Sequence, residues 1–175
     1  MKTLPLRKPR FIASILAVAF SLVVIAPEAI SAPESQANEE PFLIRTLEDL
    51  YEQWSQEVSS PEAFSAAEVA ELEAKRAELA FNLGEMYLNG QGVVQDDREA
   101  IKWYRKAAEA GIAPAMHNLG LMYDNGRGVA QDDRKAVKWY RKAAEAGIAR
   151  AMHNLGGMYA SGRGVAPDDR AAVTW

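Results

Sequence analysis

Apolar residues recur at three- and four-residue spacing along most of this chain, which is the periodicity of amphipathic helices. The first such stripe occupies residues 42–58 and is broken by Ser-Ser-Pro at residues 59–61. A second pattern begins at Ser65, which lies three residues before Glu68, the spacing of a capping box that starts a helix. No breaking residue lies between Ser65 and Leu83, and the helical periodicity continues to Gly90. The pattern therefore predicts two helices, of which the second is long.

From residue 77 onward the pattern repeats with a period of 36 residues. Residues 77–112 are followed by a near copy at 113–148 and by a shorter third copy at 149–175. A fixed period of this size indicates stacked units, each unable to bury its apolar face alone. We predict an all-α solenoid of helix-turn-helix repeats. Because terminal units of a solenoid must differ from internal ones, residues 42–76 are predicted to form an N-terminal helical cap.

Each repeat is predicted to contain two helices, here called helix A and helix B. In the second copy, helix A covers residues 114–124, with a proline at the first turn, where its missing N–H costs nothing. Residues 125–128 contain two glycines and form a loop. Asp132 is placed to cap helix B by accepting hydrogen bonds from its first backbone N–H groups. Helix B then continues to Gly147.

The predicted core is formed by the same positions of each repeat. On helix A, Leu119, Met122 and Tyr123 share a face, and on helix B the pair Trp-Tyr shares another with alanines, while a glycine recurs inside helix A. The glycine lies inside the helix, where it costs about 1 kcal/mol relative to alanine. We therefore predict that it allows the close approach of a neighbouring ring. The predicted core residues are Leu83, Gly84, Tyr87, Trp103, Tyr104, Leu119, Gly120, Tyr123, Trp139, Tyr140, Leu155, Gly156, Tyr159 and Trp175.

The amino-terminal segment has the composition of an export signal. In residues 1–31, four basic residues precede the apolar run 11–26, and small residues follow at Ala29 and Ser31. This is the pattern of a secretory signal peptide, with cleavage expected after Ser31. An uncleaved membrane anchor is the alternative. Either way the body is predicted to be exported, to the periplasm or to the medium, behind a disordered acidic linker at residues 32–41.

Net charge and cysteine content exclude several classes of function. The chain carries −4 overall, and since its first 31 residues carry +3, the remainder carries −7. An acidic body argues against binding to nucleic acid or to an anionic membrane. The absence of cysteine excludes a disulfide framework and a thiolate zinc site.

No catalytic signature is found in the sequence. The only histidines, His117 and His153, occupy one repeat position, which is Phe81 in the first copy. That pattern favours packing or a contact surface over a metal site. The two consecutive aspartates before each helix B resemble an acid–base pair, but capping of the helix explains them more simply. The sequence therefore predicts no enzyme activity, no cofactor and no metal.

The stretch AMHNLGLMYDNGRGVAQDDRKAVKWYRKAAEAG resembles the Sel-one-like repeat family, a relative of the tetratricopeptide repeat. The shared features are a Leu-Gly pair with a following Tyr, a Gly-x-Gly-Val loop, the aspartate, the Trp-Tyr pair and the closing Lys-Ala-Ala-Glu-x-Gly. The resemblance implies a right-handed α/α superhelix that mediates protein–protein contacts through a groove lined by helix A. The partner-binding positions that it implies are Glu78, Phe81, Asn82, Glu85, His117, Asn118, Leu121, Asp124, Arg150, His153 and Asn154.

The functional hypothesis is a non-catalytic scaffold or adaptor that holds a peptide or protein segment in this groove. The recurring asparagines at 82, 118 and 154 either pair with the backbone of such a segment or bond a neighbouring helix. Two alternatives remain. One is a cell-envelope hydrolase with an unrecognised site. The other is a structural array that self-associates through the open C-terminal end, because the third helix B stops at Trp175.

Overall fold

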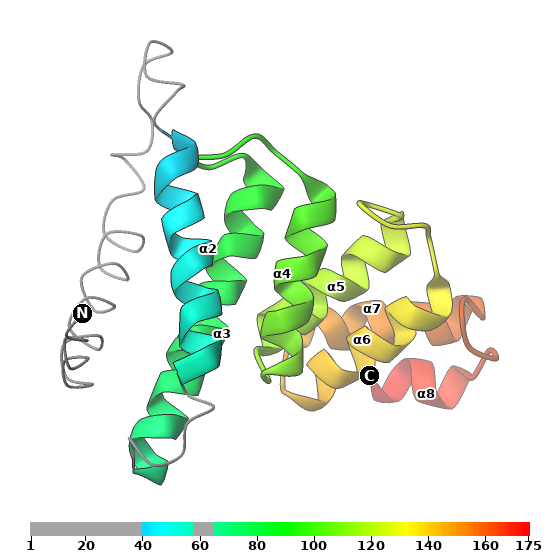
Figure 1. The fold of residues 1–175 in the computed structure, drawn as a ribbon. Helices are drawn as coiled ribbons and strands as arrows, with labels where there is room; N and C mark the ends of the chain where they lie inside the picture. Colours follow the sequence, from blue (N-terminus) through cyan, green and yellow to red (C-terminus); the bar gives the residue numbers. More distant parts are fainter. Residues whose placement is uncertain (1–39, 58–64) are drawn as a thin grey trace, which may run out of the picture. The chain divides into compact units, whose positions relative to one another are not determined.

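The computed structural model describes residues 40–57 and 65–175, and within these ranges the regular secondary structure is entirely helical (Figure 1). The prediction of an all-α solenoid of repeats is confirmed. The predicted signal peptide and nearly all of the predicted linker lie outside the described residues. The helices are α2 (Glu40–Glu57), α3 (Ala66–Asn89), α4 (Asp97–Glu109), α5 (Ala113–Asn125), α6 (Asp133–Glu145), α7 (Ala149–Ser161) and α8 (Asp169–Thr174).

The chain divides into two compact units, the first ending at Glu73 and the second spanning Ala74–Trp175. In the first unit, α2 begins at Glu40, two residues before the start predicted from the apolar stripe. Leu47 and Tyr51, four residues apart on one face of α2, are buried. The start of α3 has the predicted capping box. The backbone N–H and the hydroxyl of Ser65 both donate to the carboxylate of Glu68, over 2.9 and 2.8 Å.

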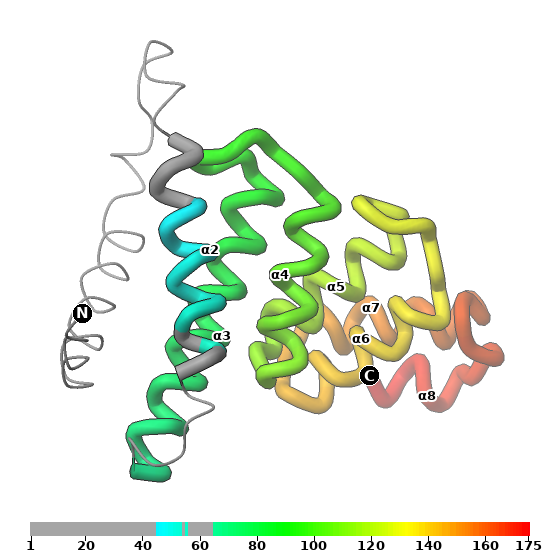
Figure 2. Tube along the Cα trace, viewed as in Figure 1, coloured from blue at the N-terminus to red at the C-terminus, as the bar shows by residue number. Residues whose placement is uncertain are grey.

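The second unit contains the three repeats, and the tube in Figure 2 follows them as successive helical hairpins. Helix A of each repeat is the latter part of α3, then α5, then α7, and helix B is α4, α6 and α8. The first aspartate of each pair caps helix B, as predicted. Asp96, for example, accepts hydrogen bonds from the backbone N–H groups of Arg98 and Glu99. Gly126 and Gly162 end their helices in the left-handed conformation, with φ of +67°.

Small residues and rings fill the space between helices A and B. Leu119 and Tyr140 have no exposed surface, and the same is true of Leu83 and Tyr104 one repeat earlier. The core glycines lie directly against these rings. A methyl group added to Gly120 would lie 2.5 Å from Cε1 of Tyr140. The third repeat differs, because Gly156 there faces the backbone carbonyl of Ala172.

Burial is less complete at the outer edge of the repeats. Trp103 is 6% exposed, whereas Trp139, expected to be equally buried, is only partly covered. In both repeats a lysine of the same helix covers the outer ring face. The Nζ of Lys106 lies 4.1 Å from the Trp103 ring centroid, and that of Lys142 lies 4.9 Å from the Trp139 centroid. Of the other predicted core residues, Tyr87, Tyr159 and Trp175 are also partly exposed.

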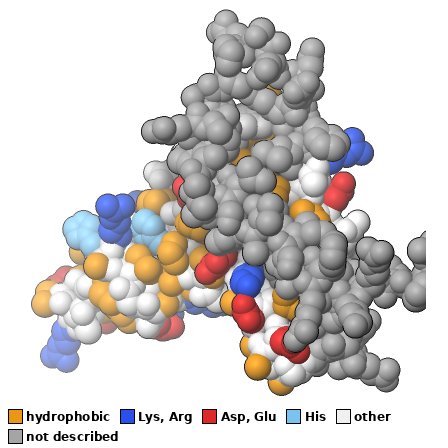
Figure 3. Space-filling view, turned by 90° about the vertical axis from the view of Figure 1, so that its left-hand side faces the viewer, with side chains coloured by type: hydrophobic (Ala, Val, Ile, Leu, Met, Phe, Trp, Pro, Cys, Tyr) orange, Lys and Arg blue, Asp and Glu red, His pale blue; other side chains and the backbone are white. Residues whose placement is uncertain are grey.

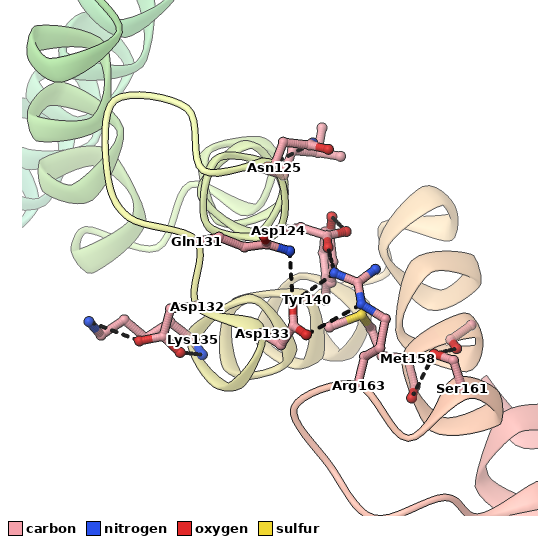
Figure 4. A network of polar contacts seen from close by, with 12 residues as sticks. Asp124, Asn125, Gln131, Asp132, Asp133, Lys135, Tyr140, Met158, Ser161 and Arg163 are labelled. Carbon is pink, nitrogen blue, oxygen red and sulfur yellow. Dashed lines mark hydrogen bonds and ion pairs between the residues drawn. The ribbon is translucent and has the colours of Figure 1, made fainter.

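Consecutive repeats are joined by an arginine in the loop after helix A. The Arg163 guanidinium donates to Asp133, at the start of α6, over 2.7 Å, and also to Asp124 at the end of α5 (Figure 4). One repeat earlier, Arg127 donates to Asp97 in the same way over 2.7 Å. The second aspartate of each pair thus binds the following repeat, where such an arginine is present.

Candidate functional site

The residues predicted to bind a partner lie along helix A of the three repeats, and their exposure differs widely. His117 is almost fully buried, with 9% of its surface exposed. Glu78, Arg150 and His153 are exposed. The partly buried members are Phe81, Asn82, Glu85, Asn118, Leu121, Asp124 and Asn154. We call the surface that these residues form the helix A face.

Two carboxylates of the helix A face are engaged in packing between helices. Glu85 accepts hydrogen bonds from the Tyr104 hydroxyl and, over 2.9 Å, from the Asn118 amide. Asp124 accepts one from the Tyr140 hydroxyl over 3.1 Å. Burial, and after it these carboxylates, raises the pKa of both tyrosines far above the ordinary value. Both hydroxyls therefore remain protonated donors that tie helix B to helix A.

The recurring asparagines bond the preceding repeat. The Asn118 amide donates to Glu85 on α3, and Nδ2 of Asn154 lies 3.4 Å from Nε2 of His117 on α5. Because an amide NH₂ can only donate, this contact makes Nε2 the acceptor. Of the two interpretations of these residues, a bond to a neighbouring helix is the one seen for Asn118 and Asn154. Asn82 occupies the equivalent position on α3.

The surroundings of His117 favour its neutral form. Its ring packs against that of Tyr140, with centroids 6.0 Å apart, just as Phe81 packs on Tyr104 at 5.9 Å. Burial lowers the pKa of His117 below the ordinary value of 6.5, and the nearby charge of Arg150 lowers it further. A phenyl ring in the first repeat and an imidazole ring in the second thus occupy the same position and pack against the tyrosine of helix B.

A shallow, open depression of about 480 Å³ lies on the helix A face between α5 and α7. Figure 3 shows the two histidines of the chain on one face, with a basic side chain between them and hydrophobic surface beside them. Five predicted partner-binding residues meet in this depression, whereas Glu78, Phe81, Asn82, Glu85, Asn118 and Asp124 do not line it. The lining residues are His117, Leu121, Ala149, Arg150, His153 and Asn154.

Two properties of the residues that line the depression were not predicted from the sequence. Ala149 was missed, because a small residue at a helix start carries no signal of its own in the sequence. No acidic residue lines the depression, which leaves Arg150 and the imidazole of His153 as its exposed polar groups. The site therefore offers an apolar surface beside hydrogen-bond donors and a positive charge.

The described residues contain no cluster of three or more metal-ligating side chains. Among these residues, no helix is long and apolar enough to cross a bilayer.

The two aspartates of each pair have different structural roles. Asp132 caps α6 through the N–H of Lys135, and its neighbour Asp133 binds Arg163.

A family model described as the Sel1 repeat matches residues 77–112, 113–148 and 149–175. The chain belongs to the Sel1 repeat family. The match covers more than half of the sequence and coincides with the three hairpins of the second unit. Sel1 repeat proteins are generally scaffolds for protein–protein interaction, and the family is typically non-enzymatic.

Solved Sel1 repeat structures resemble this chain. A Sel1 repeat protein from Oxalobacter formigenes is 42% identical, with 61% of this chain and 81% of that chain covered and a TM-score of 0.54. A protective antigen of uropathogenic Escherichia coli strains with the same repeat fold is 31% identical, with a TM-score of 0.55. That match covers 83% of this chain but only 32% of the antigen, so this Sel1 protein spans about a third of that relative. A comparison with curated proteins finds no match.

Proposed function

We propose that this Sel1 repeat protein is an exported, non-catalytic scaffold that binds a peptide or protein segment on its helix A face. The observation that carries the proposal is the meeting of five residues, chosen from the sequence alone, in one depression between α5 and α7. Of the five, Arg150 and His153 are exposed and Leu121 is partly exposed, so these three side chains remain accessible to a partner. The family's general role in protein–protein interaction supports the same conclusion.

The chemistry of the depression suits a segment of polypeptide. Leu121 and Ala149 provide an apolar surface, while Arg150 and His153 provide donors at the surface. An apolar patch with a polar rim is the usual composition of a protein interface. The depression is open to solvent, which suits one or two side chains of a passing segment better than an enclosed small molecule.

The proposal is tested by selecting random peptides displayed on phage against the mature chain, and then measuring their affinity by fluorescence anisotropy. Leu121→Arg adds a charged side chain at the centre of the lining. We expect it to weaken binding of the selected peptides by about tenfold or more. Ala130→Arg adds the same charge at an exposed loop position and serves as the control. Circular dichroism must show unchanged helicity in both variants.

Export is supported by the basic, apolar and small-residue order of residues 1–31. Expression of the full chain in a Gram-negative host, followed by N-terminal sequencing of the periplasmic product, tests it. We expect the product to begin at Ala32. Recovery of the protein from the cytoplasm with Met1 at its start would overturn the proposal of export.

A second candidate function, self-association, is favoured by one observation. A second depression between α7 and α8 is lined largely by small and apolar residues that include Gly157, Ala160 and Trp175, and Val173 nearby on α8 is 88% exposed. If this surface joins two copies, light scattering of the purified protein will show a mass that rises with concentration, and Val173→Lys will abolish the rise. A constant monomer mass argues against it.

A further inference from the structure

The depression between α5 and α7 is locally positive in an acidic protein. Arg150 is exposed and forms no ion pair within the described part of the chain. Its charge is close enough to His117 to lower the pKa of that histidine. The complete sequence, by contrast, carries a net charge of −4. The depression thus contains a positive group and no acidic residue. A partner that binds there is expected to carry a complementary negative charge.

Arg150 differs in its contacts from four other arginines of the repeats. Arg127 and Arg163 bind aspartates of the preceding repeat. Arg105 and Arg141 donate to the tyrosine hydroxyls of the following repeat, over 3.0 and 2.7 Å. These four arginines contact neighbouring repeats, whereas Arg150 makes no such contact with the residues that the structure describes.

The position of Arg150 is also specific to one repeat. The equivalent residue is Glu78 in the first repeat and Pro114 in the second. The third repeat alone therefore presents a cation at the start of helix A. Because this cation lies beside the apolar Leu121, the depression combines a charged and an apolar contact at one point of the helix A face.

We propose that this depression binds an acidic residue, aspartate or glutamate, within an extended partner segment, together with an apolar side chain next to it. The carboxylate is received by the Arg150 guanidinium, with the exposed imidazole of His153 as a second donor, and the apolar side chain lies on Leu121 and Ala149. The depression is open, so the segment crosses it and is not required to end there. This inference rests on the function proposed above and specifies the chemistry of the partner.

The geometry gives each element of the site a separate task. An arginine accommodates a carboxylate through two parallel N–H donors, which fixes its orientation as well as its charge. The neighbouring apolar contact supplies most of the binding free energy through burial, because an exposed ion pair contributes little. The carboxylate therefore selects the register of the segment, and the apolar side chain anchors it.

The test uses the peptides selected by phage display against the mature chain. We expect the selected sequences to be enriched in aspartate or glutamate beside a large apolar residue. One labelled peptide is then compared with its counterpart in which the acid is replaced by asparagine or glutamine. Both that replacement and Arg150→Glu should weaken binding by about fivefold or more. Arg134→Glu, the same charge reversal at an exposed position of α6, should leave the affinity unchanged.

A double-mutant cycle separates direct contact from a general charge effect. If the acid binds Arg150, the amide peptide should lose no further affinity on the Arg150→Glu variant. Peptides that depend on Leu121 but show no acidic preference and no response to Arg150→Glu would overturn this inference and leave the proposed function intact. A failure to select any peptide, or binding insensitive to Leu121→Arg, would overturn both.

Discussion

Gly120 of α5 lies in direct contact with the buried ring of Tyr140 on α6, and the same relationship holds between Gly84 and Tyr104 one repeat earlier. In each case the ring lies where a side chain on helix A would otherwise be. The tyrosine hydroxyl then reaches a carboxylate of helix A, Asp124 in the one case and Glu85 in the other. Helices A and B are thus fixed by a steric fit and a hydrogen bond from the same residue.

The first prediction concerns this contact. Gly120→Ala would place Cβ 2.5 Å from Cε1 of Tyr140, so the ring or the helix must move. Alanine gains about 1 kcal/mol of helix propensity, but overpacking of a filled core costs typically about 1–3 kcal/mol. We expect a net decrease of up to roughly 2 kcal/mol in the free energy of unfolding, measured by urea denaturation.

Gly157, also inside a helix, is the matched control. A methyl group there would have no neighbour within 4 Å, so Gly157→Ala should stabilise the protein by up to about 1 kcal/mol. Equal effects of the two substitutions on stability would show that contact with Tyr140 is not the reason for a glycine at position 120.

The second prediction concerns the loop after helix A, which packs against the preceding repeat. Gly164 has φ of +67°, and a side chain there would collide with the backbone of Asp133 and Arg134. Gly111 has φ of +96° with nothing within 4 Å, so it shares the backbone strain without the collision. Both alanine variants should lose about 1 kcal/mol or more through strain. Gly164→Ala should lose roughly 1–3 kcal/mol beyond that. Thermal unfolding followed by circular dichroism gives the comparison, and equal losses would contradict the collision.

The third prediction concerns Arg163. Its bonds to Asp133 and Asp124 connect two repeats, but its side chain is 42% exposed, so solvent screens them. Arg163→Gln should lower the free energy of unfolding by at most about 1 kcal/mol, and most of that difference should vanish in 1 M NaCl. Lys138→Gln, at an exposed position of α6, controls for the change in net charge. A loss that is unaffected by salt would point to packing as its cause.

The fourth prediction is a pH dependence. Burial lowers the pKa of folded His117 below 6.5, so the unfolded chain binds the proton more readily. Its contribution to stability is therefore complete above pH 6.5 and decreases as the pH falls from 6.5 towards the folded pKa. We expect urea denaturation to show lower stability at pH 5.5 than at pH 7.5.

His117→Phe should reduce that difference, because Phe81 shows that a phenyl ring packs at the same position against Tyr104. The same slope in the His117 variant would mean that another group titrates in this range.

The helices, their caps and the period of the solenoid follow from the sequence by itself. Each depends on residues close along the chain, as with Ser65 and Glu68 at the start of α3 or Asp96 before α4. The fit of a ring against Gly84 and Gly120 also follows, since a glycine at one phase of helix A has few other physical explanations, whereas Gly156 meets the backbone of Ala172 and not a ring. Local chemistry and strict repetition were sufficient for these features.

Only the tertiary structure decided which polar side chains form contacts between stacked repeats and which remain accessible to a partner. Arg163 and Asp133 are 30 residues apart, and Asn154 and His117 are 37 apart. Such pairs form only where one hairpin is set against the next at a particular offset, which the pattern of a single repeat does not specify. Arg127 and Arg150 are both exposed arginines of the repeats, yet stacking brings an aspartate to the first and none, among the described residues, to the second.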